Sequence, residues 1–225
     1  MRSVVAVVVA CACLSGAAGI EGARPAADDQ SRRTTSKPKP KPKPAPLPAM
    51  KIEPAKVECR ESLGNGVKTT ASYCFVLAGR DPAEGVLVTI PPHREGATLT
   101  FNLHNRHTYS EQDVKAGRAY SKYSAVIGVL TMKGDLLGRG AVQSEFRTVK
   151  DLFERIGGGA PPSGLKAVAP IGNETIYIEV PADVTQVSLL GELLESLTAI
   201  GKETANPGRP VAIVSNVRVE YRPLK

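Results

Sequence analysis

Two histidines and a glutamate stand close together in the middle of the sequence, at the spacing of metal ligands. His104 and His107 form the segment HNRH, and Glu111 follows shortly after. Zinc sites in proteins use imidazole nitrogens and carboxylate oxygens, and three protein ligands leave one position open for water. The three residues are therefore the candidate metal ligands of a secreted metal-dependent hydrolase. The alternative is that all three are solvated surface side chains. A helix would aim both histidines of an HxxH pair at one metal ion, whereas this pair follows a strand pattern.

A second group of polar and aromatic residues surrounds these histidines. Three tyrosines and two arginines fall in the same polar stretch, at Arg106, Tyr109, Arg118, Tyr120 and Tyr123. Tyrosine and arginine are enriched where proteins contact their partners. We interpret these five residues as a candidate ligand-binding surface. The alternative is an ordinary loop whose tyrosines pack at the edge of the fold.

The usual sequence patterns of catalytic sites do not occur in this chain. No GxSxG nucleophile motif is present, and no cysteine lies beside a histidine. The glycine run at 157–159 is not followed by the Lys-Ser/Thr pair of a phosphate-binding loop. The sequence therefore favours a non-catalytic binding module without a cofactor, and the hydrolase or a structural envelope subunit are the alternatives.

The elements that position these residues are predicted to be mainly β-strands. Thr98–His104 alternates, with Leu99, Phe101 and Leu103 on one face and His104 on the other. Such an alternation with period two indicates a half-buried strand. We therefore expect His104 on the outer, solvent-facing side of a sheet.

Similar patterns recur along the rest of the domain. One helix is expected from Thr148 to Ile156, where apolar residues recur at helical spacing before a glycine. The segment 192–200 fits a helix or a strand. Strands are predicted at Lys56–Ser62, Val67–Leu77, Val86–Ile90, Ala125–Met132, Leu136–Phe146, Thr175–Val180, Val184–Leu190 and Val211–Tyr221. Many short strands with Gly and Pro turns predict a mainly β fold, a jelly-roll-like β-sandwich with one or two short helices.

Two segments of the domain share one form. Val86–Leu103 and Ile176–Leu190 each run as strand, proline, polar turn and strand, and Val211–Tyr221 closes the domain. In this form the chain resembles the galactose-binding-like jelly-roll modules of secreted bacterial proteins. The resemblance implies a β-sandwich, and it adds glycans to the ligands to be considered. The expected partner is a protein or a glycan at the cell envelope.

Cys59 and Cys74 lie on either side of Gly64-Asn65-Gly66. Asn-Gly favours a tight hairpin turn because both residues tolerate positive φ. The two cysteines are then nearly cross-strand partners. In an oxidising compartment such a pair forms a disulfide, and the alternative is two free thiols.

The N-terminus has the features of an export signal. Arg2 precedes an apolar run from Val4 to Leu14, and the small residues Ala17-Ala18-Gly19 offer a cleavage site. Residues 1–19 are therefore a predicted signal peptide, and the mature protein is expected to be secreted, periplasmic or in the cell envelope. An uncleaved anchor is one alternative. Val8-Val9-Ala10-Cys11 resembles a bacterial lipobox, so a lipid anchor at Cys11 is the other. Contact with a membrane is expected only through such an N-terminal anchor.

Residues 20–51 form a predicted disordered spacer ahead of one domain at 52–225. Its segment KPKPKPKPAPLP holds the backbone in polyproline II and resembles the Lys-Pro segment of TonB-type envelope proteins, which implies reach away from a surface. The first 51 residues carry six of the seven net positive charges of the chain. A nucleic-acid-binding domain concentrates basic residues on its folded face, so no nucleic-acid partner is expected.

Overall fold

The computed structural model describes residues 46–105, 107–109, 111–146, 152–157, 166–170, 174–198 and 201–224. The chain divides into units of residues 1–44 and 45–225, and only the second is described below. The predicted signal peptide, Cys11 and most of the spacer lie outside the described residues. Within those residues no helix has the length and hydropathy needed to cross a membrane.

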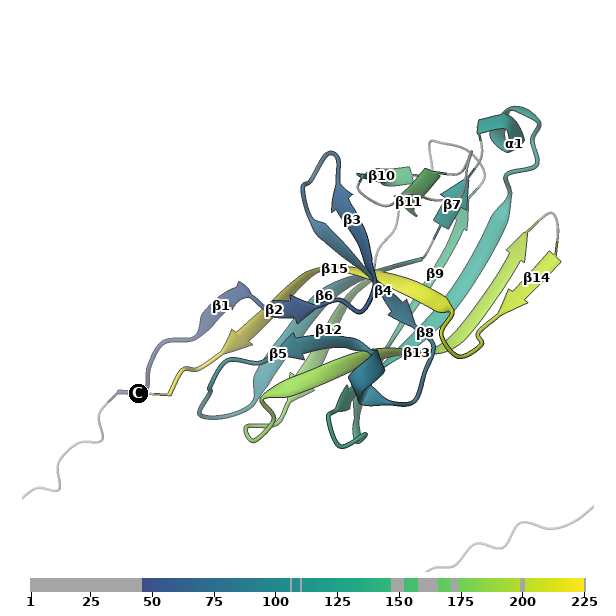
Figure 1. Ribbon diagram of the computed structural model, residues 1–225. Coiled ribbons are helices and arrows are strands. Elements are labelled where there is room, and N and C mark those ends of the chain that lie inside the picture. Colours follow the sequence, from purple (N-terminus) through teal and green to yellow (C-terminus); the bar gives the residue numbers. More distant parts are fainter. Residues whose placement is uncertain are drawn as a thin grey trace, which may run out of the picture. The chain divides into compact units, whose positions relative to one another are not determined.

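The described strands form two antiparallel sheets, which confirms a mainly β, two-sheet sandwich (Figure 1). The first sheet has the order β12-β6-β15-β4-β3-β10-β11-β7, and β1 also pairs with β15. Its strands are β1 (Lys51–Pro54), β3 (Ser62–Gly66), β4 (Ser72–Leu77), β6 (Ala97–Asn105), β7 (His107–Tyr109), β10 (Leu152–Gly157), β11 (Lys166–Pro170), β12 (Glu174–Val180) and β15 (Pro210–Tyr221). The second sheet has the order β2-β5-β13-β8-β9, and β14 also pairs with β13. Its strands are β2 (Lys56–Glu58), β5 (Val86–Thr89), β8 (Ser121–Thr131), β9 (Leu136–Phe146), β13 (Gln186–Thr198) and β14 (Gly201–Thr204).

Apolar side chains of the two sheets meet in one core. Leu99 and Phe101 of β6 and Val219 of β15 contribute from the first sheet, and Ile127 and Leu189 from the second; all five are fully buried. In β6 the buried residues alternate with partly exposed ones from Ala97 to Leu103, as the sequence predicts. Burial of these side chains supplies the main stabilisation of the sandwich.

One side of the sandwich is closed by the edge strands β9 and β12. Gly138 and Gly140 of β9 lie against Ile178 and Ile176 of β12: a Cβ added at Gly138 would lie 2.7 Å from Ile178 Cδ1. Glycine is required here because the branched side chains of β12 fill the space that a side chain on β9 would need.

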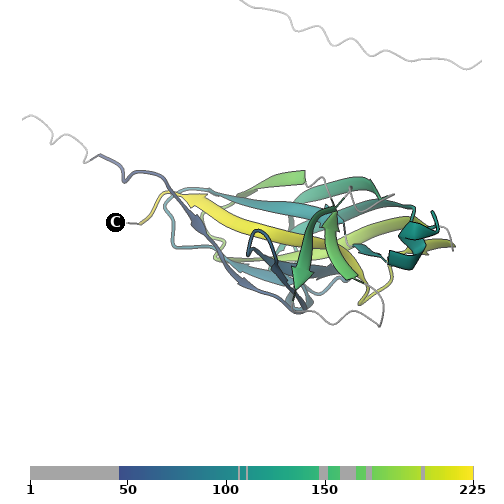
Figure 2. The same cartoon turned by 90° about the horizontal axis from the view of Figure 1, so that it is seen from above.

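The described chain enters and leaves the domain at one end. β1 pairs with the last residues of β15, Lys51 opposite Tyr221, and Arg222 Nη1 donates to the Pro48 carbonyl at 2.7 Å. Figures 1 and 2 both show β1 beside the C-terminus and the short helix α1 (Glu111–Lys115) at the opposite end. We call the end with β1 and Arg222 the attachment end, and the end with α1 the far end.

The Cys59–Cys74 disulfide is present, with the two Cα atoms 5.5 Å apart. Its placement differs from the expected hairpin. Cys59 follows β2 of the second sheet, whereas Cys74 lies in β4 of the first sheet, opposite Ser62. The chain passes from one sheet to the other between Glu58 and Ser62, and the disulfide joins the two sheets.

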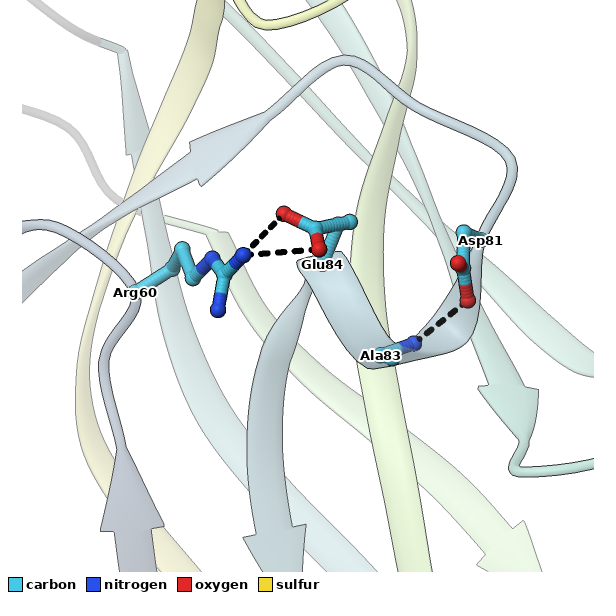
Figure 3. A network of polar contacts seen from close by, with 4 residues as sticks. All are labelled: Arg60, Asp81, Ala83 and Glu84. Atoms are coloured by element: carbon cyan, nitrogen blue, oxygen red, sulfur yellow. Dashed lines mark hydrogen bonds and ion pairs between the residues drawn. The ribbon is translucent and has the colours of Figure 1, made fainter.

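An ion pair lies beside this crossing. Arg60 Nη2 contacts both carboxylate oxygens of Glu84, at 2.7 and 2.6 Å (Figure 3). Glu84 ends the 3-10 helix η1 (Pro82–Glu84), whose N-cap is Asp81: the Ala83 N–H donates to Asp81 Oδ1 at 2.9 Å. Because both partners are about half exposed, the pair positions the crossing more than it stabilises the fold.

The turn of the first hairpin also differs from the expectation. Asn65 and Gly66 belong to β3, and Asn65 lies opposite Ser72 of β4. The turn is the following segment, closed by the Gly66 N–H donating to the Ala71 carbonyl at 2.8 Å. A longer loop therefore replaces the tight Asn-Gly turn.

The predicted strands that correspond to β5, β6, β9, β12 and β15 are confirmed, with starts and ends within one or two residues. The strand predicted from Ala125 is also confirmed, and as β8 it begins earlier, at Ser121. The helix expected from Thr148 to Ile156 is wrong where the structure describes that segment, because Leu152–Gly157 is strand β10, paired with β3 and β11. The segment 192–200 continues β13 as far as Thr198. A bulge between Gly191 and Leu193 shifts the alternation and explains why both registers carry leucine.

Candidate functional site

His104 lies on the face of β6 opposite the main core, but it is only 1% exposed. Its Nε2 lies 2.8 Å from Ser215 Oγ, and its ring centroid lies 5.5 Å from that of Tyr73. The expectation of a solvated His104 is therefore wrong. A second apolar cluster that includes Leu63, Tyr73 and Ile213 covers this part of the first sheet, so alternation marks the two faces of β6 but not which one meets water.

The other proposed metal ligands follow directly after β6. His107 opens strand β7, and Glu111 opens helix α1. Their side chains, that of Tyr109, and the whole of Arg106 lie outside what the structure describes. No group of three metal-binding side chains forms among the described residues, so the metal site stays a prediction.

Three members of the Tyr/Arg group lie in or next to the start of β8. Arg118 Nη2 donates to Asp113 Oδ1 at 3.1 Å, and the Arg118 N–H donates to the Asp113 carbonyl at 2.8 Å. Arg118 is mostly exposed, Tyr120 is half-buried, and Tyr123 packs against the main core from the inner face of β8. The structure thus gathers these residues at the far end, with the arginine held by an acidic neighbour and one tyrosine turned inward.

Next to these residues Phe146 of β9 packs against Val114 and Ala119, and further along β8 and β9 the inner face becomes polar. Ser196, Tyr123 and Ser144 are register partners across β13, β8 and β9, on the inner face of the second sheet. Asn105 of β6 approaches from the first sheet, and its Nδ2 donates to Ser144 Oγ at 2.5 Å. We call Asn105, Tyr123, Ser144 and Ser196 the inner polar layer. It is the part of the described interior closest in sequence to the predicted ligand group.

Two atoms of the inner polar layer have unused hydrogen-bonding capacity. Asn105 is 0% exposed and Ser196 is 1% exposed. Within the described part of the chain, Asn105 Oδ1 and Ser196 Oγ have no hydrogen-bond partner. Leaving such a buried group unpaired costs about 1–3 kcal/mol. These unpaired atoms make the inner polar layer less stabilising than the apolar core beside it.

A further accessible tyrosine lies on the outer face of the first sheet. Tyr177 of β12 is 69% exposed and stands in register with Thr100 of β6, which stands in register with Arg218 of β15. No motif in the sequence marks this row. The one signal for it is the polar face of the alternating strand, which predicts solvent exposure but not binding.

A buried tyrosine at the attachment end has a perturbed titration. Tyr221 is 6% exposed, and its hydroxyl donates to Glu53 Oε1 at 2.9 Å. This hydrogen bond, then burial, then the negative charge of Glu53 raise the pKa of Tyr221 above its usual value of 10.0. The bond ties β1 to the last strand and is a structural contact.

Taken together, the described residues define a two-sheet antiparallel β-sandwich whose far end carries an exposed ion pair beside a small apolar cluster. Comparison with protein families, with curated proteins and with solved structures finds no match to this chain.

Proposed function

We propose that this chain is an exported, non-catalytic binding module of the cell envelope, held away from a surface by its Lys-Pro spacer. Its ligand is a protein or a glycan. It binds at the far end, through the connection between β6 and β8 that carries Tyr109, Arg118 and Tyr120, above the inner polar layer.

The observation that carries this proposal is that the spacer joins the domain at one end and the candidate site lies at the other end. The described chain begins at Pro46, and the nearby Pro48 is hydrogen-bonded to Arg222 beside the C-terminus. Helix α1 lies at the other end (Figures 1 and 2). A spacer joined at the first end presents the second end outward. A stiff polyproline II segment also keeps a binding face at a distance from its anchor.

The chemistry of the far end supports recognition of a polar ligand. Arg118 and Asp113 are exposed and paired, and the half-buried Tyr120 offers an aromatic ring with a hydroxyl. Aromatic and planar polar groups of this kind bind sugar rings and peptide side chains alike. The inter-sheet disulfide supports an oxidising compartment.

The binding test uses the chain without its predicted signal peptide, immobilised through its N-terminus. An envelope fraction of the source cell is passed over it, with and without trypsin digestion. Retention that survives trypsin indicates a glycan, and retention that trypsin removes indicates a protein. Tyr120→Ala and Arg118→Ala are each expected to reduce retention at least about tenfold. Each removes one aromatic or arginine contact, and a contact of about 1.4 kcal/mol corresponds to a tenfold change in affinity.

Tyr177→Ala is the matched control, because it removes an exposed tyrosine from the outer face of the first sheet. If only the control lowers retention, binding occurs on that face and the proposed far-end site is refuted. Retention of nothing from either fraction refutes the binding function. Export is tested separately by the intact mass of the native protein, which reports signal removal, any lipid and the disulfide.

A further inference from the structure

Strand β1 is an edge strand with an open side. It pairs with β15 alone among the described strands. Ile52 is 59% exposed and Met50, just before the strand, is 46% exposed. An edge with free backbone groups and exposed apolar side chains can pair with another strand.

The register of β1 shows which backbone groups point outward. The Ala55 N–H donates to the Val217 carbonyl at 3.0 Å. In an antiparallel pair, hydrogen-bonded positions alternate with non-bonded ones. Glu53 and Lys51 therefore direct their backbone groups toward β15, and Ile52 directs its N–H and carbonyl away from β15, toward the open side.

The sequence around Ile52 is complementary to itself when read in the opposite direction. From Met50 to Pro54 it runs apolar, positive, apolar, negative, apolar. Two copies paired antiparallel about Ile52 place Ile52 opposite Ile52, Lys51 opposite Glu53 twice, and Met50 opposite Pro54 twice. Opposite charges facing each other across strands stabilise a pair, and like charges destabilise it.

No other centre within β1 fits both the backbone and the charges. Pairing centred on Lys51 or Glu53 sets two like charges directly opposite each other, which destabilises the pair. Pairing centred on Pro54 lacks the N–H groups it needs. In the Ile52-centred pair, the Pro54 carbonyl of one copy accepts a hydrogen bond from the Met50 N–H of the other. Because Pro54 has no N–H, the Met50 carbonyl at the end of the pair is hydrated instead.

We propose that β1 is the interface of a two-fold homodimer, in which the β1 strands of two copies pair antiparallel about Ile52 and join the first sheets of both copies. The interface is isologous, as closed dimers require. It involves only the end of the domain that carries β1, so both far ends stay exposed. Because the two strands run antiparallel, the residues before Met50 of the two copies leave the pair at its opposite ends.

The test is a pair of charge substitutions followed by analytical ultracentrifugation of the chain without its predicted signal peptide, across a concentration series. The wild type is expected to dimerise as concentration rises. Lys51→Glu sets a new carboxylate against Glu53 of the other copy at two places and is expected to weaken dimerisation at least about tenfold. Lys51→Gln removes the charge without adding a like charge, leaves the Tyr221–Glu53 hydrogen bond in place, and is expected to weaken dimerisation less than Lys51→Glu.

Cysteine cross-linking gives an independent measurement. In a hydrogen-bonded cross-strand pair the Cα atoms lie about 5.5 Å apart, within disulfide range. Ile52→Cys is therefore expected to form a covalent dimer on mild oxidation. Val67→Cys is the control, because Val67 is 70% exposed and lies in a loop away from β1. A wild type that stays monomeric at every concentration, a Lys51→Gln dimer as weak as the Lys51→Glu dimer, or equal cross-linking of both cysteine variants would each overturn the proposal.

Discussion

Removing the Cys59–Cys74 disulfide tests whether the link between the two sheets stabilises the fold as a constraint on the unfolded chain. The perturbation is Cys59→Ser with Cys74→Ala: Cys59 is partly exposed, and Cys74 is 4% exposed within the main core. Serine at the first position and alanine at the second avoid burying a new hydroxyl.

The magnitude follows from the size of the closed loop. The two cysteines are 15 residues apart. Closing a loop of that size lowers the entropy of the unfolded chain, which raises the free energy of unfolding by about 3 kcal/mol. For a domain of this size, each kcal/mol corresponds to about 2–4 °C in Tm, so Tm is expected to fall by about 6–12 °C.

The assay is equilibrium urea unfolding with and without a phosphine reductant. Reduction of the wild type is expected to lower the free energy of unfolding by the same amount as the double substitution, and the substituted protein should not respond to the reductant. If the reduced wild type keeps its unfolding midpoint, the disulfide does not stabilise the sandwich and the reasoning from loop entropy is wrong.

Three further changes test other contacts. Gly138→Val is expected to destabilise by about 1–3 kcal/mol, measured by urea unfolding, because its side chain would overlap Ile178 across the sandwich; a neutral result would show that the Ile178 side chain shifts to make room. Glu53→Ala is expected to lower the pKa of Tyr221, measured by ultraviolet titration of the phenol, since Glu53 is the first cause of the raised value. Because that pKa is raised, the Tyr221 contribution is complete below about pH 10 and is lost as pH rises through the folded-state pKa, so the wild type and Glu53→Ala should converge in stability only in strong alkali. Thr70→Gly is expected to stabilise by up to about 1 kcal/mol in thermal unfolding, because Thr70 has φ of 59°, which glycine adopts without strain.

The sheet content of the fold could be predicted from the sequence because alternation is a local property. Thr98–His104, Leu136–Phe146 and Val211–Tyr221 show it within a few residues, and each is a strand in the structure. The helix expected up to Ile156 failed because the apolar pair Leu152-Phe153 satisfies helical spacing and also fits a strand, and pairing with β3 and β11 decides between them. Local spacing carries no information about such partners.

The candidate site was less predictable because it depends on how the two sheets lie against each other. His104 is buried by residues of β3, β4 and β15 far away in the sequence, such as Tyr73 and Ser215. The inner polar layer forms only when Asn105 meets Ser144 of the opposite sheet. No motif marks either arrangement. The Tyr/Arg group could be proposed because its members are neighbours in the sequence, and its role in binding stays a prediction.

The neighbouring positions of Pro46 and Leu224 have a practical consequence for protein engineering. The strands that follow and precede these residues, β1 and β15, pair directly, so a short glycine-serine bridge could close the chain into a ring. New termini opened at the exposed Lys133-Gly134 turn between β8 and β9 would then give a circularly permuted protein with the same strand pairings. For the same reason the domain could be grafted into a surface loop of a host protein, which would display Tyr120 and its neighbours away from the graft point.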